Sequence, residues 1–184
     1  MIGIDEVGRG CWAGPLLVVA VRQTADLPAG LKDYKLVSKK RRESLRYDIE
    51  LACDIGEGWV MPAEIDHLGL SESMRLATTR ALEALQAKLN EKIIFDGNIN
   101  YCDASYIKAS AVIDADALFP IVSAASIYAK VLRDTYMAEL PERYAPYEFE
   151  RHVGYGTARH RELLRRHGVS DQHRKSFAPI KALL

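Results

Sequence analysis

Two carboxylates stand side by side near the start of the chain, at Asp5 and Glu6, directly after the short apolar run 2–4. Arg9 follows them between two glycines, so a cation lies within a few residues of both acids. Two neighbouring carboxylates are costly to hold together unless a positive charge neutralises them. Arg9 is one source of that charge. A bound metal ion is another, and it would leave the glycine-flanked backbone of 8–10 free to approach a phosphate.

Two simpler interpretations of this stretch compete with a catalytic one. An ordinary turn with solvated charges accounts for Asp5 and Glu6 taken alone. Residues 8–13 also match the glycine spacing of a dinucleotide-binding fingerprint, but that fingerprint needs a helix to begin at the glycines. Gly14-Pro15 and the apolar run Leu16–Val21 predict a second strand instead. The stretch is therefore predicted to form a hairpin with acids in its first strand and a cation at its bend.

The string Asp5-Glu6-Val7-Gly8-Arg9-Gly10, with Ala13-Gly14-Pro15 after it, resembles the opening signature of the ribonuclease HII family, endonucleases that cut at ribonucleotides embedded in or joined to DNA. The resemblance extends from Gly3 to about Pro179. It implies an α/β fold of the ribonuclease-H-like type, with a mixed central sheet flanked by helices and a helical C-terminal extension. Residues 1–140 would form the catalytic core and 141–184 the extension packed on it, as a single domain overall.

Two further acidic positions match the family. Asp96 ends an apolar strand predicted at 93–96 and precedes a glycine, which by itself is typical of a plain turn. In register with the family's Asp-Gly-Asn, Asp96 lies at the C-terminal edge of a buried strand, which is where α/β sheets bind their ligands. Asp116 is assigned by its register to Phe119-Pro120 and the Ser-Ala-Ala-Ser block that follows. Asp114 stands where the family commonly has a basic residue, so it departs from the pattern and competes with Asp116.

The resemblance implies that four carboxylates are both the catalytic residues and the metal ligands: Asp5, Glu6, Asp96 and Asp116. Hard oxygen ligands suit Mg²⁺ or Mn²⁺, and two such ions would activate a water and stabilise the leaving oxygen. Because adjacent residues of a strand point to opposite faces, Asp5 and Glu6 can share a ligand only where their strand ends or is distorted.

The implied substrate is an RNA/DNA hybrid, or a DNA duplex that contains ribonucleotides. The implied cut falls on the 5′ side of the ribonucleotide and leaves a 3′-hydroxyl and a 5′-phosphate. Two other functions stay open at this point. One is a ribonuclease-H-like nuclease that acts on DNA, and the other is a non-catalytic nucleic-acid-binding module whose carboxylates merely hold Arg9 and Lys35.

Three places are implied to contact the substrate. Gly8-Arg9-Gly10 would read the 2′-hydroxyl, the group that distinguishes RNA from DNA. Tyr155, between two glycines, is by itself typical of a packed loop residue, but the family pattern around it implies a ring that stacks on the sugar beside the ribonucleotide. Lys35 is the third, in a loop where Tyr34 and Leu36 depart from the family's Asp-Ser-Lys-Lys-Leu-Ser.

The composition suits one globular domain, because 48% of the 184 residues are hydrophobic. The net charge is zero, but basic residues concentrate in 35–42 and 151–181, which modestly supports a phosphate track although such runs are usually solvated faces. No apolar run approaches the about 20 residues needed to cross a bilayer, and Met1 precedes the first strand without a leader. Three scattered cysteines favour a reducing compartment. We expect a cytoplasmic monomer without membrane association.

Local signals predict the remaining elements. Ser38 is expected to cap a helix that ends before Gly56, and a short strand is expected at 59–63. The remaining expectations are a helical region at 64–89 with Glu64 and Asp66 as partners of its N-terminus, a strand at 107–113, a helix from Pro120, and a helix between Thr157 and Gly168. Lys130, Arg133 and Asp134 on the helix from Pro120 are predicted to be mainly helix-surface and packing groups, and Asp134 is a candidate for added charge around the metal site. The dispersed histidines are predicted to lie on the surface: His152, His160, His167 and His173.

Overall fold

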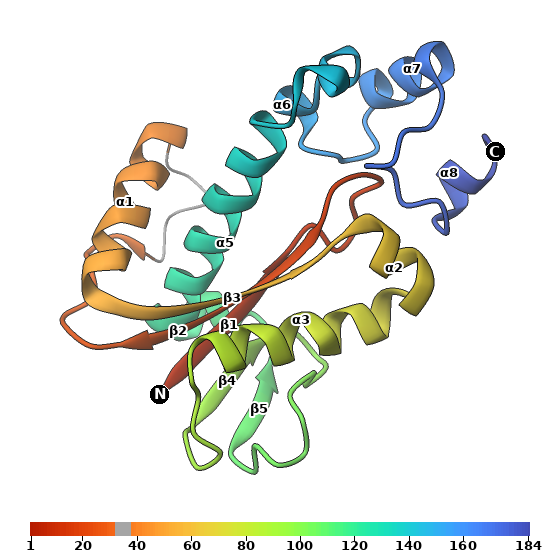
Figure 1. Ribbon diagram of the computed structural model, residues 1–184. Coiled ribbons are helices and arrows are strands. Elements are labelled where there is room, and N and C mark those ends of the chain that lie inside the picture. The colour runs from red at the N-terminus through yellow and green to blue at the C-terminus, as the bar shows by residue number, and fades with distance from the viewer. Residues whose placement is uncertain (32–37) are drawn as a thin grey trace.

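A central sheet of five strands organises the computed structural model, which describes residues 1–31 and 38–184 (Figure 1). The strand order is β3-β2-β1-β4-β5. Three strands form an antiparallel set, namely β1 (Ile2–Val7), β2 (Leu16–Gln23) and β3 (Cys53–Val60). Two more follow in parallel with β1, namely β4 (Ile93–Asp96) and β5 (Ala109–Val112). The predicted mixed sheet is confirmed. The loop contact predicted at Lys35, with Tyr34 and Leu36, lies outside the described residues.

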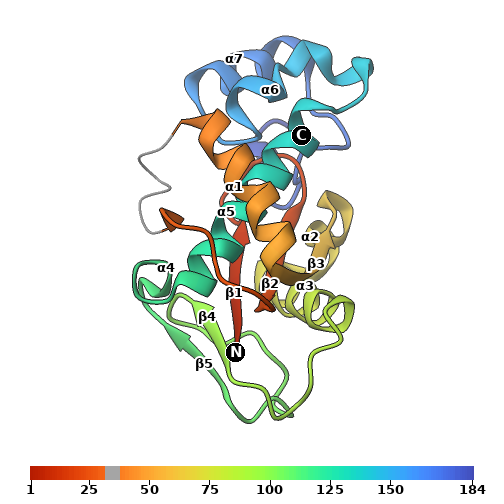
Figure 2. The same ribbon diagram turned by 90° about the vertical axis from the view of Figure 1, so that its left-hand side faces the viewer.

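Helices cover both faces of this sheet, as predicted. One face carries α1 (Lys39–Ala52) and α5 (Pro120–Ala138), and the other carries α3 (Leu70–Ala84) (Figures 1 and 2). Shorter helices complete the chain: α2 (Pro62–Leu68), α4 (Ala115–Leu118), the 3-10 helix η2 (Glu142–Tyr147), α6 (Phe149–His152), α7 (Ala158–His167) and α8 (Ala178–Lys181). The last four gather at the end of the sheet where β1 connects to β2 (Figure 2). No helix within the described residues is long and apolar enough to cross a membrane.

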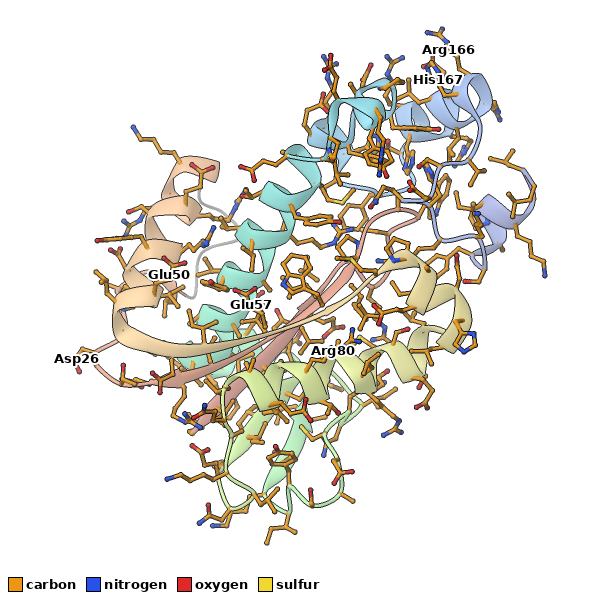
Figure 3. All side chains as sticks on the ribbon, in the orientation of Figure 1. Asp26, Glu50, Glu57, Arg80, Arg166 and His167 are labelled. Atoms are coloured by element: carbon orange, nitrogen blue, oxygen red, sulfur yellow. The ribbon has the colours of Figure 1, made fainter. Side chains whose placement is uncertain are left out.

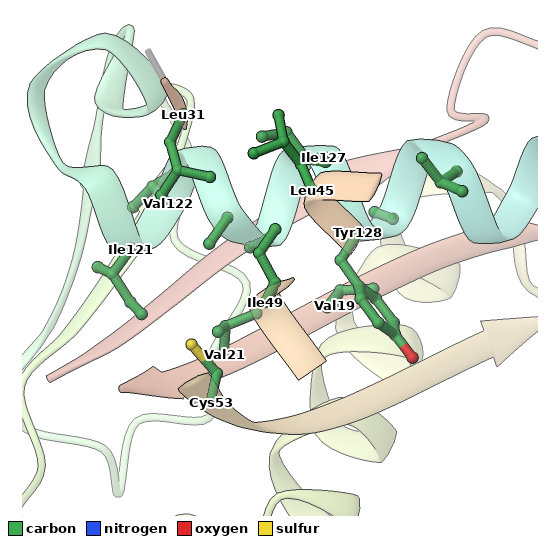
Figure 4. Packing of buried hydrophobic residues seen from close by; sticks show 14 of the residues in the cluster. Val19, Val21, Leu31, Leu45, Ile49, Cys53, Ile121, Val122, Ile127 and Tyr128 are labelled. Atoms are coloured by element: carbon green, nitrogen blue, oxygen red, sulfur yellow. The ribbon is translucent and has the colours of Figure 1, made fainter. Parts of the chain in front are cut away.

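The alternation of side chains along β2 creates two separate cores. Val19 and Val21 face α1 and α5 and belong to one buried cluster with Ile49 (Figure 4). Val18 and Ala20 face the opposite way and belong to the cluster beneath α3. Because β2 is central and covered on both faces, its apolar residues run continuously rather than alternating with polar ones.

Several local signals are confirmed by the structure. Ser38 caps α1, with its hydroxyl accepting from the Arg41 amide at 3.3 Å. Thr157 caps α7 in the same manner, at 3.1 Å from the His160 amide, and α7 ends before Gly168. Pro120 is the first residue of α5, where its missing N–H costs nothing.

Two boundaries differ from the sequence expectation, and glycine explains both. The helical region expected at 64–89 is divided by Gly69, whose φ of 75° a continuous helix cannot contain. The strand expected at 59–63 begins earlier, at Cys53, and includes Gly56 and Gly58. A Cβ on Gly58 would collide with the Ala77 carbonyl of α3, so these glycines serve close packing rather than helix termination.

The two acids expected near the N-terminus of the α2 helix serve different segments. Glu64 accepts from the Met61 amide at 2.8 Å, as a capping residue should. Its other oxygen lies 2.8 Å from Nη2 of Arg80, a residue of α3 (Figure 3). Asp66 does not cap its own helix. Its carboxylate accepts from the amides of Lys175 and Ser176 at 2.9 and 2.8 Å, and so ties the C-terminal segment to α2.

Replacing Gly58 with alanine should lower the free energy of unfolding by about 1–3 kcal/mol, because the added Cβ must push α3 away from β3. Urea unfolding followed by circular dichroism measures the change. Gly10→Ala is the matched control, since a Cβ there meets no atom within 4 Å. An unchanged urea midpoint for Gly58→Ala would show that α3 does not depend on this close approach.

Candidate metal and substrate site

Asp5 and Asp96 become neighbours through the parallel pairing of their strands. The register joins Ile4 of β1 to Phe95 of β4, and the two aspartates are the next residues on each strand. Phe95 is buried beneath α3, so alternation turns Asp96 to the opposite face, toward α5. Asp5 faces the same way, because its carboxylate bonds with Ser126 of α5. Two predicted site residues therefore share one face at one end of the β1–β4 pair.

The Asp5 carboxyl group is strongly perturbed. Its side chain is 9% exposed, and this burial, with the added repulsion of Glu6 and Asp96, raises its pKa to about 8. Hydrogen bonds from Ser126 and from the Glu6 amide, at 2.8 Å, oppose the shift but do not cancel it. A buried, mutually repelling set of carboxylates is stabilised by a cation, and its oxygens are the ligands that Mg²⁺ and Mn²⁺ prefer.

Glu6 has a different partner from Asp5. Their strand stays regularly paired through Val7 and Leu17, so it neither ends nor distorts at the two acids. The Glu6 carboxylate lies 3.6 Å from Arg9, and Arg9 also donates to the Tyr101 hydroxyl at 3.4 Å. Burial raises the pKa of Glu6 and the Arg9 charge opposes that rise. The arginine therefore acts as the counter-ion of Glu6 in this structure.

The fourth carboxylate is buried in the short helix that follows Asp114. Asp116 lies in α4 and is 7% exposed, whereas its rival Asp114 is exposed and adopts a left-handed φ of 55° just before that helix. Asp96 accepts from the Ala115 amide at 2.7 Å, which fastens the start of α4 to the end of β4. This arrangement favours Asp116 over Asp114 as the partner of Asp96.

The four carboxylates do not form a ready-made ion cage. Among residues 1–31 and 38–184, no three His, Cys, Asp or Glu side chains are arranged so that they could hold a metal ion as they stand. The donor chemistry nevertheless fits a divalent ion. To join Asp5 on one ion, Glu6 would have to turn away from Arg9.

The loop of residues 8–15, which joins β1 to β2, rests on two buried arginines. Arg133 of α5 donates to the carbonyls of Pro15 at 2.8 Å and Ala13 at 3.1 Å. Arg174 donates to the carbonyls of Gly14 and Arg9, both at 3.0 Å. Both arginines are fully buried. The packing role expected of Arg133 is confirmed and its surface position is not, and the phosphate-track role expected of the basic run 151–181 is wrong for Arg174. Carbonyl oxygens, rather than phosphates, accept from both guanidinium groups, and Nη2 of Arg174 has no hydrogen-bond partner among the described residues.

This support leaves the tip of the loop open to an incoming ligand. Arg9 and Gly10 are exposed, and Gly10 has free space where a side chain would lie. Gly8 is buried with a φ of 86°, and a Cβ there would collide with Arg133. The glycines therefore have separate tasks, because one packs on the arginine and the other keeps the backbone accessible.

Tyr155 lies against this loop although it is remote in sequence. The Gly154 carbonyl accepts from the Trp12 amide at 2.8 Å, and the Tyr155 hydroxyl bonds with the Cys11 thiol. The tyrosine is 42% exposed, and the Lys130 ammonium lies 5.7 Å from the centre of its ring. The structure thus brings Gly8-Arg9-Gly10 and Tyr155, all predicted substrate contacts, to one end of the sheet.

The expectation that the C-terminal histidines lie on the surface is wrong for three of the four. His152, His160 and His173 are 6%, 0% and 1% exposed, and only His167 is exposed as predicted. Aromatic neighbours such as Phe149 exclude water from their rings. Their dispersion along the sequence gave no signal of this cluster, because it forms only when the segment after α7 folds back.

Comparison with known proteins gives a consistent result. The sequence model of the family described as Ribonuclease HII matches residues 2–180. A curated protein called Ribonuclease HII from Shewanella loihica is 42% identical over 186 residues, which cover 99% of this chain and 88% of that one. Its counterpart from Erythrobacter litoralis is 41% identical, covering 98% and 88%.

Solved structures with the same fold are also similar along the whole chain. Ribonuclease H2 from Pyrococcus horikoshii has a TM-score of 0.76 and 27% identity, covering 99% of this chain and 95% of that one. Ribonuclease HII from Archaeoglobus fulgidus, in a complex with PCNA, has a TM-score of 0.79 and 27% identity, covering 94% and 91%. Bst-RNase HIII, solved with Mn²⁺, shares the fold at a TM-score of 0.69 and 20% identity, covering 98% and 67%.

The raised pKa of Asp5 predicts how the metal-free protein responds to pH. The folded state binds this proton more tightly than the unfolded chain, so the free energy of unfolding should fall as pH rises from about 4 toward 8. Asp5→Asn should remove much of this fall, which is on the order of a few kcal/mol. Urea unfolding in chelator at several pH values measures it, with the exposed Asp26→Asn as control. Identical pH profiles of unfolding free energy for wild type and Asp5→Asn would contradict the raised pKa of Asp5.

Proposed function

The chain belongs to the ribonuclease HII family, and on that premise we propose that it hydrolyses the phosphodiester on the 5′ side of a ribonucleotide, in an RNA/DNA hybrid or within duplex DNA. It is a metal-dependent endoribonuclease of the ribonuclease H type. The observation that supports this cleavage is the pairing of the buried Asp5 with the half-buried Asp96, at the end of the sheet where the loop tip at Gly10 is exposed.

We assign the metal-binding role to Asp5, Glu6, Asp96 and Asp116. When bound, two Mg²⁺ or Mn²⁺ ions activate a water and stabilise the leaving oxygen of an in-line displacement. Asp5 and Asp96 present their oxygens on the α5 side of the sheet, and Asp116 is fastened beside Asp96. Glu6 would complete the set only if its carboxylate turned from Arg9 toward the ions, and Arg9 would then be free to meet the substrate.

The recognition of the ribonucleotide is assigned to the loop 8–15 and Tyr155. The open space at Gly10 allows the backbone to approach a sugar closely, where a peptide group can bond to the 2′-hydroxyl. The half-exposed ring of Tyr155 stacks on the neighbouring sugar. Arg133 and Arg174 do not touch the substrate in this proposal, because their donors hold the carbonyls that shape the loop.

A cleavage assay tests the reaction and its specificity together. An end-labelled DNA duplex with one internal ribonucleotide is incubated with Mg²⁺, Mn²⁺ or chelator, beside an all-DNA duplex. We expect one metal-dependent cut immediately 5′ of the ribonucleotide, with a 3′-hydroxyl on the upstream product. Equal cleavage of the all-DNA duplex would favour a DNA nuclease of the same fold, and a cut on the 3′ side would refute the proposed chemistry.

The two acids flanking Ala115 provide a matched pair of variants. Asp116→Asn should abolish cleavage while leaving the circular dichroism spectrum and the thermal midpoint near those of wild type, because it removes a ligand and keeps the side-chain shape. Asp114→Asn should retain activity within about twofold, since its side chain is exposed. The reverse outcome would transfer the assignment to Asp114.

A further inference from the structure

Three buried histidines surround the backbone of Tyr155. His152 ends α6, His160 lies in the first turn of α7, and His173 lies in the segment after α7. The rings of His152 and His160 stack at 4.2 Å between centroids, and those of His160 and His173 lie 5.2 Å apart. No step of the proposed reaction uses these side chains, and all three are shielded from solvent.

The hydrogen bonds of the cluster determine where each proton lies. A neutral imidazole has one donor nitrogen and one acceptor nitrogen. Nδ1 of His160 is 2.9 Å from the Tyr155 carbonyl, which can only accept, so this nitrogen carries the proton. Nε2 of His160 must then accept, and its partner, 3.0 Å away, is Nε2 of His173, which must donate.

The remaining contacts agree with this assignment. Nδ1 of His173 is left as an acceptor, and it receives the Ser170 amide at 3.0 Å. His152 has the same tautomer as His173, because its Nε2 is 2.8 Å from the Tyr147 carbonyl and its Nδ1 accepts from the Gly154 amide at 3.2 Å. One chain of donors therefore runs from Ser170 through two histidines to the Tyr155 carbonyl.

Burial keeps the cluster neutral at physiological pH. It lowers the pKa of His160 to about 4 and that of His173 to about 3, and it also lowers the pKa of His152. A second proton on His160 would place two N–H groups face to face across the 3.0 Å contact with His173. The arrangement of donors and acceptors is therefore the only one that satisfies every nitrogen.

We propose that His152, His160 and His173 are positioning residues that hold the peptide groups on either side of the Gly154–Tyr155 step and thereby aim the Tyr155 ring at the substrate. His152 holds the Gly154 amide, and His160 holds the Tyr155 carbonyl. His173 fixes the His160 tautomer, and its backbone forms an isolated β-bridge with Ala13 in the loop 8–15. The inference rests on the proposed contact of Tyr155 with the sugar.

A spectroscopic measurement tests the cluster without any reference to activity. Long-range ¹H–¹⁵N correlation spectra of the wild-type protein at pH 7 distinguish the two tautomers and the imidazolium. We expect the Nδ1–H form for His160 and the Nε2–H form for His152 and His173, with assignments made from single variants. An imidazolium at any of the three, or the Nε2–H form at His160, would overturn the proposal.

A double-mutant cycle tests the consequence for catalysis. His160→Leu should lower kcat/KM on the single-ribonucleotide duplex on the order of 10- to 100-fold, as expected when a contact residue is misplaced. The same change made on Tyr155→Ala should cause little further loss, because the two act as a unit. His160→Asn, whose amide nitrogen can replace Nδ1 as the donor, should recover part of the activity.

His167→Leu is the control, because it changes an exposed histidine of the same helix that lies outside the cluster and has only an edge contact with the Tyr147 ring (Figure 3). It should leave kcat/KM unchanged. An equal loss from His160→Leu in both backgrounds would overturn the positioning role in favour of a general structural one. A Tyr155→Ala variant with wild-type activity would refute the sugar contact and the catalytic consequence together, and the tautomer spectrum would still decide the cluster itself.

Discussion

The parallel register between β1 and β4 is the constraint on which the candidate site depends. Ile4 pairs with Phe95, and Asp5 and Asp96 are the next residues on their strands. Two acids from distant segments therefore share one face of the sheet. Asp5 is buried and Asp96 is half-buried, since β1 is central and α5 covers that face. Burial makes the ionised pair unfavourable, which is the physical reason that a divalent cation fits there. Carboxylates on an edge strand would be hydrated, and their negative charge would not require a bound cation.

Two buried cations then shape the surface beside the acids. Arg133 and Arg174 donate hydrogen bonds to carbonyls of the loop 8–15. These bonds hold the buried side of the loop, and its tip stays open. Carbonyl oxygens solvate a buried guanidinium better than an apolar core does, and truncating either side chain would leave several acceptors without donors. The positive charge of these residues contributes to the architecture of the loop and not to a phosphate track on the surface.

The C-terminal segment completes the site instead of forming a separate module beside it. Gly154 bonds to Trp12, His173 is bridged to Ala13, and Asp66 holds the amides of Lys175 and Ser176. Each contact joins positions that are more than 100 residues apart. The histidine cluster adds contacts of shorter range, because it links the segment after α7, through the first turn of α7, to the backbone of Tyr155.

Elements whose signals are local could be predicted from the amino-acid sequence. The cap at Ser38, the helix start at Pro120, the strand at 93–96 and the α7 boundaries depend on neighbouring residues only, and the structure confirms each. The motif around Asp5 indicated the family and the mixed sheet. The burial of polar groups could not be predicted in this way, because it depends on long-range packing. Arg133, Arg174 and three histidines become interior when the C-terminal segment packs on the loop 8–15. The contact of Glu6 with Arg9 also depends on the tertiary structure, because it requires β1 to stay paired past the acids.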